Sequence, residues 1–399
     1  MMQHISVLTN VRRISPLDGD YFFGYYDLQP FSGNIHLAHR VPFADRLPRR
    51  DERAEIGIIH LGNGSFERLD TTAAWNFQQG AMLQWLPGRA GEEILYNCVA
   101  DGELCTAILN IHTGKKRLLD RPVANVSPDG RYALSINFAR LFDFRPGYGY
   151  ATYGDPFYYQ YHSREDGVFL IDLVTGKSQL ILSLQELWEL TGAHFSWDEQ
   201  KLVINHVAFN TDGSRFLLLL RNFPASGQRH KTAIITANCD GKEVYLLSDY
   251  GVQSHYHWKN ARQVIFYAGG RELRCARGWA NNYLLTDLTH EGEAVADYYF
   301  QEDNHMSYSP DRKCLLTDSY PDEQNLQTLR LYDIAGDTLV QLGRFYSVSR
   351  PLIDLRCDLH PRWDETGGRV SFDSTHEGQR GLYLIETADI IDSVRAGNR

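Results

Sequence analysis

Three stretches of the chain share the pattern that decides its fold: NVSPDGRYALSIN (125–137), MSYSPDRKCLLTD (306–318) and PRWDETGGRVSFDS (361–374). In each of them a polar or aromatic lead-in is followed by a turn containing Pro, Asp or Gly, and then by a short apolar run. Turn residues placed between two β-forming runs are typical of a β-hairpin. Each stretch is therefore predicted to begin a small antiparallel sheet.

The hairpin pattern recurs along the chain, and a second strand pair follows most of its copies. Further copies are LQWLPGRAGEEILYN (83–97), AFNTDGSRFLLLL (208–220) and YHWKNARQVIFYA (256–268), and DGVFLIDLVTGKSQLIL (166–182) is a second pair. Four antiparallel strands per repeat are typical of a propeller blade. With blades beginning near residues 22, 80, 124, 206, 255, 305 and 360, we predict an all-β fold, one seven-bladed β-propeller domain spanning residues 1–399.

Three features depart from the plain repeat. The last repeat runs out one strand early, so an N-terminal strand within residues 5–15 is expected to complete its sheet and close the ring. An aromatic-rich insertion occupies about 140–166, and insertions of this length are usually functional. Short helices are expected at 184–191 and 388–396.

The composition limits the classes of partner. The chain has 399 residues with 40 Lys+Arg against 50 Asp+Glu, a formal net charge of −10. General nucleic-acid binding and binding to an anionic membrane both need a positive surface, so neither partner is expected. The N-terminal residues show no basic segment followed by an apolar run, and no stretch of about eighteen apolar residues occurs. We therefore expect a cytoplasmic protein.

Cysteine and arginine usage adds two further expectations. The six cysteines are scattered, with no C-x-x-C pair, so neither a disulfide framework nor a zinc-knuckle site is predicted. Of the 40 basic residues, 8 are Lys and 32 are Arg. Because Arg pairs bidentately with carboxylates, the excess either indicates a protein that binds carboxylates or reflects GC-rich coding.

Histidines stand beside the predicted starts of four successive blades. They are His206, His255, His305 and His360, and His257 follows two residues after the second of them. Equivalent positions on successive blades face one mouth of a propeller's channel, where ligand sites normally lie. Clustered imidazoles bind metal ions or act as general bases with a pKa near neutrality. For any one of these histidines, the alternative is a hydrogen bond that ties neighbouring blades together.

Short motifs around these histidines resemble those of the oligogalacturonate lyases. The motifs are N-H-x-S-x-S-P-D at 304–311, H-P-R-W-D-x-x-G-x-x-V-x-F-D-S at 360–374 and H-x-x-W at 255–258. That family consists of cytoplasmic seven-bladed propellers with TolB-like repeats. The resemblance implies an enzyme that cleaves short or unsaturated uronide chains by β-elimination, with a manganese-type divalent ion, a histidine base and an arginine. It covers the second half of the chain by motif and the first half only by blade repeats.

The resemblance also implies roles for individual residues. It places His255 at the catalytic base, Arg221 near the catalytic arginine, and His305 and His360 at two metal ligands. The family has two more ligands, a Gln three residues before His360 and a His two residues after it. Here those positions hold Cys357 and Arg362, so two of the four implied ligands are replaced.

The replacement leaves two versions of the site open. The C5 proton of a uronide becomes acidic only when the charge of the adjacent carboxylate is neutralised, by a divalent ion or by a guanidinium. In one version Arg362, which cannot ligate a cation, takes over the role of the metal. In the other, Asp358 joins His305 and His360 around Mn²⁺ or another divalent ion.

Further residues are predicted to line the same site. Aromatic rings offer stacking surfaces, and amide, imidazole and guanidinium groups donate hydrogen bonds to hydroxyls and carboxylates. On this basis the predicted substrate-binding residues are Tyr26, Gln79, Arg140, Tyr148, His257 and Arg380, and His206 is predicted to join the catalytic residues. For the aromatic residues the alternative is packing in the blade core.

Three functions compete on this sequence. We predict the first, a lyase that acts on a uronic-acid-containing polysaccharide or oligosaccharide. The second is a non-catalytic TolB/WD40-like propeller that binds a protein or a glycan. The third is glycoside hydrolysis by a carboxylate pair drawn from Asp27, Asp318, Asp358 and Asp373. Serine-hydrolase, nucleotide-binding and zincin functions have no motif in the sequence.

Overall fold

The computed structural model describes residues 3–7, 9–151, 154–192, 200–225, 227, 229–269, 280–289, 291–350 and 352–397. Strands dominate these residues, and the helical segments among them are α1 (Phe138–Phe144), α2 (Leu184–Thr191), α3 (Ala388–Gly397) and the 3₁₀ helix Ile353–Leu355. The predicted all-β class is therefore confirmed. Within these ranges no helix has the length and apolar character needed to cross a bilayer.

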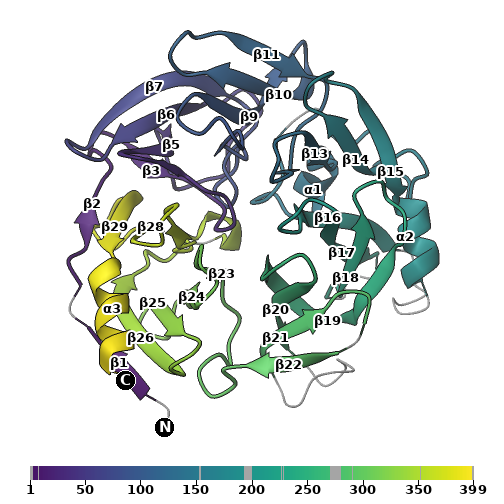
Figure 1. Ribbon diagram of the computed structural model, residues 1–399. Coiled ribbons are helices and arrows are strands. Elements are labelled where there is room, and N and C mark those ends of the chain that lie inside the picture. The colour runs from purple at the N-terminus through teal and green to yellow at the C-terminus, as the bar shows by residue number, and fades with distance from the viewer. Residues whose placement is uncertain are drawn as a thin grey trace. The chain divides into compact units, whose positions relative to one another are not determined.

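The strands form seven successive blades of antiparallel sheet, so the fold is the predicted seven-bladed β-propeller (Figure 1). Blade 1 contains β3 (Asp20–Phe22), β4 (Phe31–Ser32), β5 (Ile35–Val41), β6 (Ala54–His60) and β7 (Ser65–Thr72). Blade 2 contains β8 (Gln84–Trp85), β9 (Glu93–Ala100), β10 (Glu103–Asn110) and β11 (Lys116–Leu119). Blade 3 contains β12 (Asn125–Val126), β13 (Tyr132–Ser135), β14 (Gly167–Asp172) and β15 (Ser178–Ser183). Blades 4 and 5 contain β16 (Gln200–Phe209), β17 (Arg215–Pro224), β18 (Thr232–Asn238), β19 (Tyr245–Trp258), β20 (Gln263–Gly269), β21 (Ala280–Thr286) and β22 (Gly292–Val295). Blades 6 and 7 contain β23 (Met306–Tyr308), β24 (Cys314–Thr317), β25 (Leu326–Asp333) and β26 (Thr338–Tyr346); and β27 (Arg362–Trp363), β28 (Arg369–Ser374) and β29 (Gly381–Glu386). The long strand β19 belongs to both blade 4 and blade 5, because it pairs with β18 and neighbours β20 in the same sheet.

The N-terminal residues complete two sheets of the last blades. Strand β1 (Gln3–Ser6) runs parallel to β26, and strand β2 (Arg12–Arg13) pairs antiparallel with β29. The resulting sheet order β2-β29-β28-β27 gives the last blade its fourth strand. The expected closure by a strand from residues 5–15 is therefore confirmed.

Two of the three helices lie where the sequence predicts them. Ser183 begins α2 with a capping box, in which its hydroxyl accepts from the Glu186 amide and the Glu186 carboxylate accepts from the Ser183 amide. Helix α1 was not expected, because its sequence FARLFDF is rich in aromatic residues that favour strands. Its start depends on Asn137, whose side chain accepts from the Arg140 amide.

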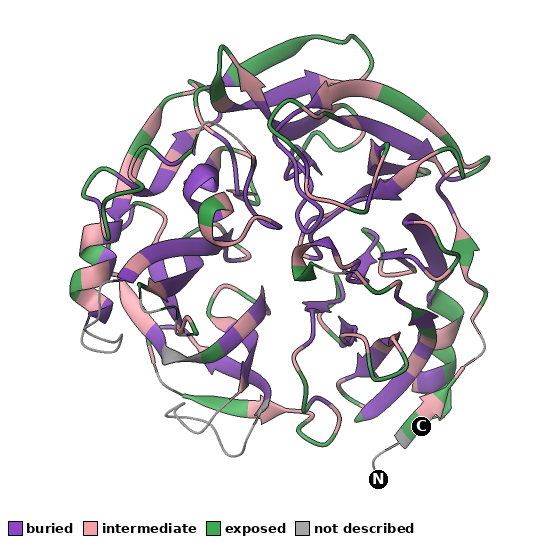
Figure 2. Ribbon diagram, turned by 180° about the vertical axis from the view of Figure 1, so that it is seen from behind, coloured by how far each residue is buried: buried purple, intermediate pink, exposed green. Residues whose placement is uncertain are grey.

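The chain separates into two compact units. Unit 1 consists of residues 1–85, 255–257 and 302–399, and unit 2 consists of residues 86–254 and 258–301. Within unit 1, α3 packs beside β25 (Figure 1), and its Ile391 and Val394 join the apolar core of blades 6 and 7. Figure 2 shows buried residues along the inner strands, whereas the outer strand β7 is mostly exposed or half-buried. The core of unit 2 includes Leu95, Ile108, Val123, Ala133 and Ile171.

Five cysteines lie in the described part of the chain, and all five are free thiols: Cys98, Cys105, Cys239, Cys314 and Cys357. Four of them are buried, and Cys239 is half-buried. These cysteines therefore act as small apolar residues, as the scattered spacing predicts.

Candidate functional site

Three of the four predicted histidines form a cluster in unit 1. His255 lies in β19, His305 directly precedes β23, and His360 lies two residues before β27, so each stands at the start of a blade. The ring centroids of His255 and His305 are 4.1 Å apart, and those of His305 and His360 are 4.2 Å apart. All three side chains are buried. We call these three residues the imidazole cluster.

The backbone is strained at two members of the imidazole cluster. His255 has a φ of 26° and His360 a φ of 41°, in the left-handed region that residues with a Cβ atom rarely adopt. Such a conformation costs roughly 1–3 kcal/mol per residue and persists only where the surrounding structure enforces it. Strain of this kind is found at functional sites, and it makes His255 and His360 candidates for one.

Two carboxylates orient the cluster. Asp303 Oδ1 lies 2.9 Å from Nδ1 of His255, and Asp318 Oδ1 and Oδ2 lie 2.9 and 3.0 Å from Nδ1 of His305. Asp318 also accepts the backbone amide of His305 at 2.9 Å, which fixes the residue at its base. A carboxylate at Nδ1 directs the Nε2 atom of the ring toward a ligand or a proton.

The three imidazoles differ in charge. Burial lowers the pKa of His255, although Asp303 opposes this, so the ring is neutral near pH 7. Burial alone would also lower the pKa of His305, but the charge of Asp318 and its hydrogen bond to the ring raise it overall. Burial and the neighbouring His305 hold the pKa of His360 well below its usual range. The cluster therefore contains a neutral base, His255, beside a ring that carries a positive charge more readily.

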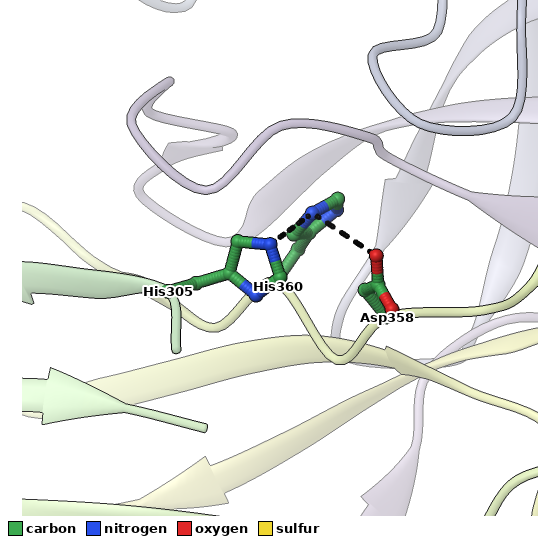
Figure 3. A group of neighbouring side chains, drawn as sticks. All are labelled: His305, Asp358 and His360. Atoms are coloured by element: carbon green, nitrogen blue, oxygen red, sulfur yellow. Dashed lines mark hydrogen bonds and ion pairs between the residues drawn. The ribbon is translucent and has the colours of Figure 1, made fainter. Parts of the chain in front are cut away.

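His305, His360 and Asp358 form a group with the geometry of a metal site. Their side chains point toward one another in Figure 3, and one ligand atom from each lies within 4.8 Å of the others. The two Nε2 atoms of His305 and His360 are 3.1 Å apart, and Oδ2 of Asp358 lies 3.9 Å from Nε2 of His360. Two nitrogen ligands at about 2.1 Å from one divalent ion, at right angles, would be about 3.0 Å apart. The three residues therefore fit a divalent ion.

Arg356 and Tyr320 adjoin this group on its more exposed side. Arg356 Nε donates to both oxygens of Asp358, at 2.7 and 2.9 Å, and the Arg356 guanidinium lies over the Tyr320 ring at 4.8 Å. The Tyr320 hydroxyl lies 3.4 Å from Nη2 of Arg356 and 3.5 Å from Nε2 of His255. Although burial would raise it, the charges of Arg356 and His305 lower the pKa of Asp358 overall. Asp358 is therefore ionised and available to a cation.

Arg362 lies in a different environment from the one its motif suggests. Its Nη2 donates to Asp373 Oδ1 at 2.7 Å and to the Gly24 carbonyl at 3.1 Å, and its guanidinium lies over the Phe23 ring at 5.1 Å. The side chain is 1% exposed. These contacts give Arg362 a structural partner within unit 1, and the arginine beside the metal-type group is Arg356 instead.

Four predicted substrate-binding residues lie in unit 1, and three of them have internal partners. Tyr26 donates from its hydroxyl to the Tyr256 carbonyl at 2.7 Å and accepts the Tyr256 amide at 2.9 Å, while its ring contacts His305. Arg380 is 2% exposed and donates to three backbone carbonyls, those of Phe77, Leu355 and Arg356. Nδ1 of His257 accepts the Tyr308 amide at 3.4 Å, and the fourth residue, Gln79, is buried.

Unit 2 holds the other predicted catalytic residues. Arg221 Nη1 lies 3.0 Å from Nε2 of His230, and burial together with Arg221 lowers the pKa of that histidine to about 3. The His206 ring contacts Tyr148 with a centroid distance of 5.7 Å, and Arg145 lies over the Tyr148 ring at 4.2 Å. None of these residues belongs to unit 1, so their placement beside the imidazole cluster stays a prediction.

Arg140 holds the insertion of unit 2 together. It is 2% exposed, pairs with Asp155 at 2.8 Å, and donates to four backbone carbonyls, those of Leu202, Phe157, Gln160 and Tyr161. A guanidinium engaged this completely fixes the backbone around it. Arg140 thus has a structural role among the described residues of the insertion, 140–151 and 154–166.

Three of the four carboxylates considered for a hydrolase pair have a basic partner, and burial raises the pKa of the fourth, Asp27, to about 7. Asp318 is bound to His305, Asp358 to Arg356 and Asp373 to Arg362. A hydrolase needs two carboxylates facing one sugar, one of them protonated. Asp27 therefore meets the need for a protonated carboxyl, whereas Asp318, Asp358 and Asp373 are each engaged by a basic side chain.

Several site residues were missed from the sequence: Asp303, Tyr320 and Arg356. Each lies in a connection between strands, where no repeat fixes its position. Asp318 had a clearer signal, because it ends the hairpin run MSYSPDRKCLLTD, as Asp373 ends the equivalent run of the last blade. Each of these equivalent aspartates binds a basic side chain of its own blade: Asp318 binds His305, and Asp373 binds Arg362.

Comparison with known proteins identifies the fold. No protein-family model and no curated protein matches the sequence. An oligogalacturonate lyase in complex with manganese is similar with a TM-score of 0.66 and 15% identity, over 95% of this chain and 93% of that one. An oligogalacturonate lyase from Vibrio parahaemolyticus has a TM-score of 0.65 and 12% identity, over 96% and 98%. The tricorn protease is less similar, with a TM-score of 0.54 and 10% identity over 94% of this chain and 34% of its own. The chain therefore resembles the oligogalacturonate lyases in structure as well as in its motifs, and this similarity concerns the fold.

Proposed function

We propose that this protein is a lyase that cleaves a uronic-acid-containing oligosaccharide by β-elimination, in the cytoplasm. The observation that carries the proposal is the buried imidazole cluster, in which a neutral histidine stands beside a His–His–Asp group of metal-site geometry. Solved oligogalacturonate lyases have the same fold, and one of them is a complex with manganese. This agreement supports the same class of chemistry here.

In this proposal His255 is the base that removes the C5 proton. Its Nδ1 is held by Asp303, which leaves Nε2 to accept a proton, and its lowered pKa keeps the ring neutral near pH 7. Nε2 lies 3.5 Å from the hydroxyl of Tyr320, whose side chain is half-buried, so the imidazole is approached from that side. Removal of the proton leaves a negative charge that spreads onto the adjacent carboxylate, and this charge must be stabilised.

His305, His360 and Asp358 would hold a divalent ion, Mn²⁺ or a similar cation, whose charge neutralises the uronate carboxylate when it is bound. Asp318 orients His305 for this role, and Arg356 orients Asp358. Arg221 is proposed to contact the substrate carboxylate as well. The metal-free version that depends on Arg362 is less well supported, because that guanidinium is paired with Asp373.

The direct test is incubation with short galacturonides while the far-ultraviolet absorbance of the unsaturated product is followed, with chelator and with added Mn²⁺. We expect product to form with Mn²⁺, and we expect His255→Ala to abolish it. His376→Ala, which changes a histidine of blade 7 outside the cluster, is the matched control. If no uronide is cleaved under either condition, the proposal is wrong and a non-catalytic binding role takes its place.

A further inference from the structure

β-Elimination requires an acid as well as a base, and the proposed function leaves that acid unassigned. When the C5 proton leaves, the C4–O4 bond breaks and its electron pair goes to O4, which is a poor leaving group until it is protonated. The acid must be able to reach the sugar from the same region as His255. The following inference rests on the proposed function and adds a residue to it.

Tyr320 is the hydroxyl group placed for this task. It lies in the connection between β24 and β25, and its side chain is only half-buried. Its hydroxyl oxygen lies 3.5 Å from Nε2 of His255, and its ring contacts the rings of His255 and His305 at 6.2 and 5.7 Å. A catalytic hydrogen bond is often this long without substrate and shortens in the complex. Base and hydroxyl therefore face the same space.

The other tyrosines next to the imidazole cluster are less suitable. The Tyr26 hydroxyl both donates to and accepts from the backbone of Tyr256, so donation to a substrate would break a buried hydrogen bond. Tyr25 and Tyr256 are 2% and 1% exposed, respectively. Among the tyrosines described around the cluster, Tyr320 is the one that a saccharide can approach without rearrangement of the core.

Arg356 prepares Tyr320 to lose its proton. The guanidinium lies over the phenol ring at 4.8 Å, and Nη2 lies 3.4 Å from the phenol oxygen. A fixed positive charge beside the oxygen stabilises the phenolate that forms when the proton leaves. The guanidinium is itself held by two hydrogen bonds to Asp358, so it does not need to reorganise during the reaction.

We propose that Tyr320 is the catalytic acid that protonates the leaving O4 oxygen. His255 Nε2 takes the C5 proton, the C5–H electron pair becomes the C4=C5 double bond, and the C4–O4 electron pair leaves with O4. The Tyr320 hydroxyl gives its proton to O4 in the same step. The protonated His255 then returns a proton to the phenolate across the contact between them, so both residues recover their starting states and no other reactant is consumed.

A change of leaving group tests this role. A 4-deoxy-4-fluoro-uronide eliminates fluoride, which leaves as a stable anion without the proton that O4 requires. Because Nε2 of His255 and the Tyr320 hydroxyl are in contact, they reach a sugar from one face, so the oxygen substrate is an oligosaccharide with a 4-linked glucuronate, whose H5 and O4 are cis. We expect Tyr320→Phe to lower kcat on this substrate by about 100-fold or more, with KM nearly unchanged, and to lower kcat on a fluoride substrate of the same configuration by less than about fivefold. The matched control is Tyr332→Phe, which removes a hydroxyl bound to Asp337 elsewhere in unit 1 and is expected to change neither rate.

The outcomes separate the inference from the proposed function. If the wild-type protein cleaves neither these substrates nor a galacturonide, the proposed function fails and the inference fails with it, whereas cleavage of a galacturonide alone overturns only the inference. If the wild-type protein cleaves both, but Tyr320→Phe keeps full activity or loses the same factor on both, only the inference is overturned. Melting temperature checks the folding of the variant. Should Tyr320→Phe not fold, Tyr320→Leu makes the same test, because it also removes the hydroxyl that only the oxygen leaving group requires.

Discussion

Two arginine–carboxylate pairs of unit 1 have similar hydrogen-bond lengths and very different surroundings. In the outer pair, Arg356 donates to Asp358 at 2.7 Å, and the arginine is 19% exposed beside Tyr320. In the inner pair, Arg362 donates to Asp373 at 2.7 Å, and both side chains are at most 2% exposed. The outer pair adjoins the imidazole cluster, whereas the inner pair holds the Gly24 carbonyl.

The difference shows why a motif position alone does not identify a functional arginine. Arg362 belongs to the family-like motif but has buried partners, while Arg356 lies outside the motif and next to the candidate site. Removing one partner of a buried ion pair destabilises the fold strongly, because the remaining charge is left without a partner in a medium of low polarity. In the outer pair Asp358 is as buried as Asp373, and only Arg356 reaches solvent, with 19% of its side chain exposed.

The largest expected effect comes from breaking the inner pair. Arg362→Met leaves the Asp373 carboxylate buried without its cation and should lower the free energy of unfolding by about 3–5 kcal/mol. Burial already raises the pKa of Asp373, although Arg362 opposes this, so the carboxylate depends on its partner. Urea unfolding measures the change, and a loss below about 1 kcal/mol would remove the distinction between the two pairs.

A divalent ion should stabilise the protein through the residues next to the outer pair. At a free Mn²⁺ concentration of about 100 times its Kd, binding raises the free energy of unfolding by about 2.7 kcal/mol. His305→Ala should abolish this gain, and His376→Ala should keep it. Thermal unfolding with and without Mn²⁺ measures both, and an equal gain in all three proteins would place the ion elsewhere.

Acid provides a smaller test of the surroundings of the inner pair. Burial, followed by the charge of Arg362, lowers the pKa of His36 in β5 to about 3. Between pH 6.5 and that value the unfolded chain binds a proton at this position that the folded protein does not, so stability falls as the pH falls. His36 should contribute about 1.4 kcal/mol per pH unit to this loss.

The quantity to measure is the slope of the unfolding free energy against pH, rather than the unfolding free energy at one pH. His36→Gln should make the decline in unfolding free energy below pH 6.5 less steep by that amount, in urea titrations at several pH values. Identical slopes for the wild-type protein and His36→Gln would contradict the burial of a neutral imidazole.

The smallest effect on stability is expected for the outer pair. Arg356→Met should lower the free energy of unfolding by only about 1 kcal/mol, although Asp358 is buried, because shortening the 19%-exposed arginine lets water reach the carboxylate. The same variant should reduce uronide cleavage strongly, since it removes the cation beside Tyr320. A stability loss as large as that of Arg362→Met, measured in the same urea titration, would show that the two pairs are equivalent.

Much of the fold follows from local sequence signals. The Pro-Asp-Gly turns of stretches such as 125–137 fix the hairpins, and the short count of strands in the last repeat predicts β2. His255, His305 and His360 occupy equivalent positions of successive blades, so the blade repeat alone predicts that they lie together. Helix α1 was missed because its cap at Asn137 outweighs the strand preference of its aromatic residues.

The partners of the site residues could not be predicted in the same way. Arg362 and Asp373 occupy facing strands, so their pairing depends on sheet register and on the burial of both side chains. Arg356 and Tyr320 lie in connections whose backbone is set by tertiary contacts, among them the contact between these two residues. Spacing therefore predicts which residues share a blade position, and three-dimensional contacts decide which of them has a partner.

Products formed in water labelled with heavy oxygen test most directly whether the imidazole cluster performs the proposed elimination. Elimination forms a C4=C5 double bond without water, so mass spectrometry of a cleaved digalacturonide should show an unsaturated product, and no more heavy oxygen in either fragment than reducing sugars exchange with the same water. The same products should be missing with His255→Ala. Saturated fragments that carry heavy oxygen would instead establish hydrolysis, and an uncleaved substrate would leave the cluster without the proposed activity.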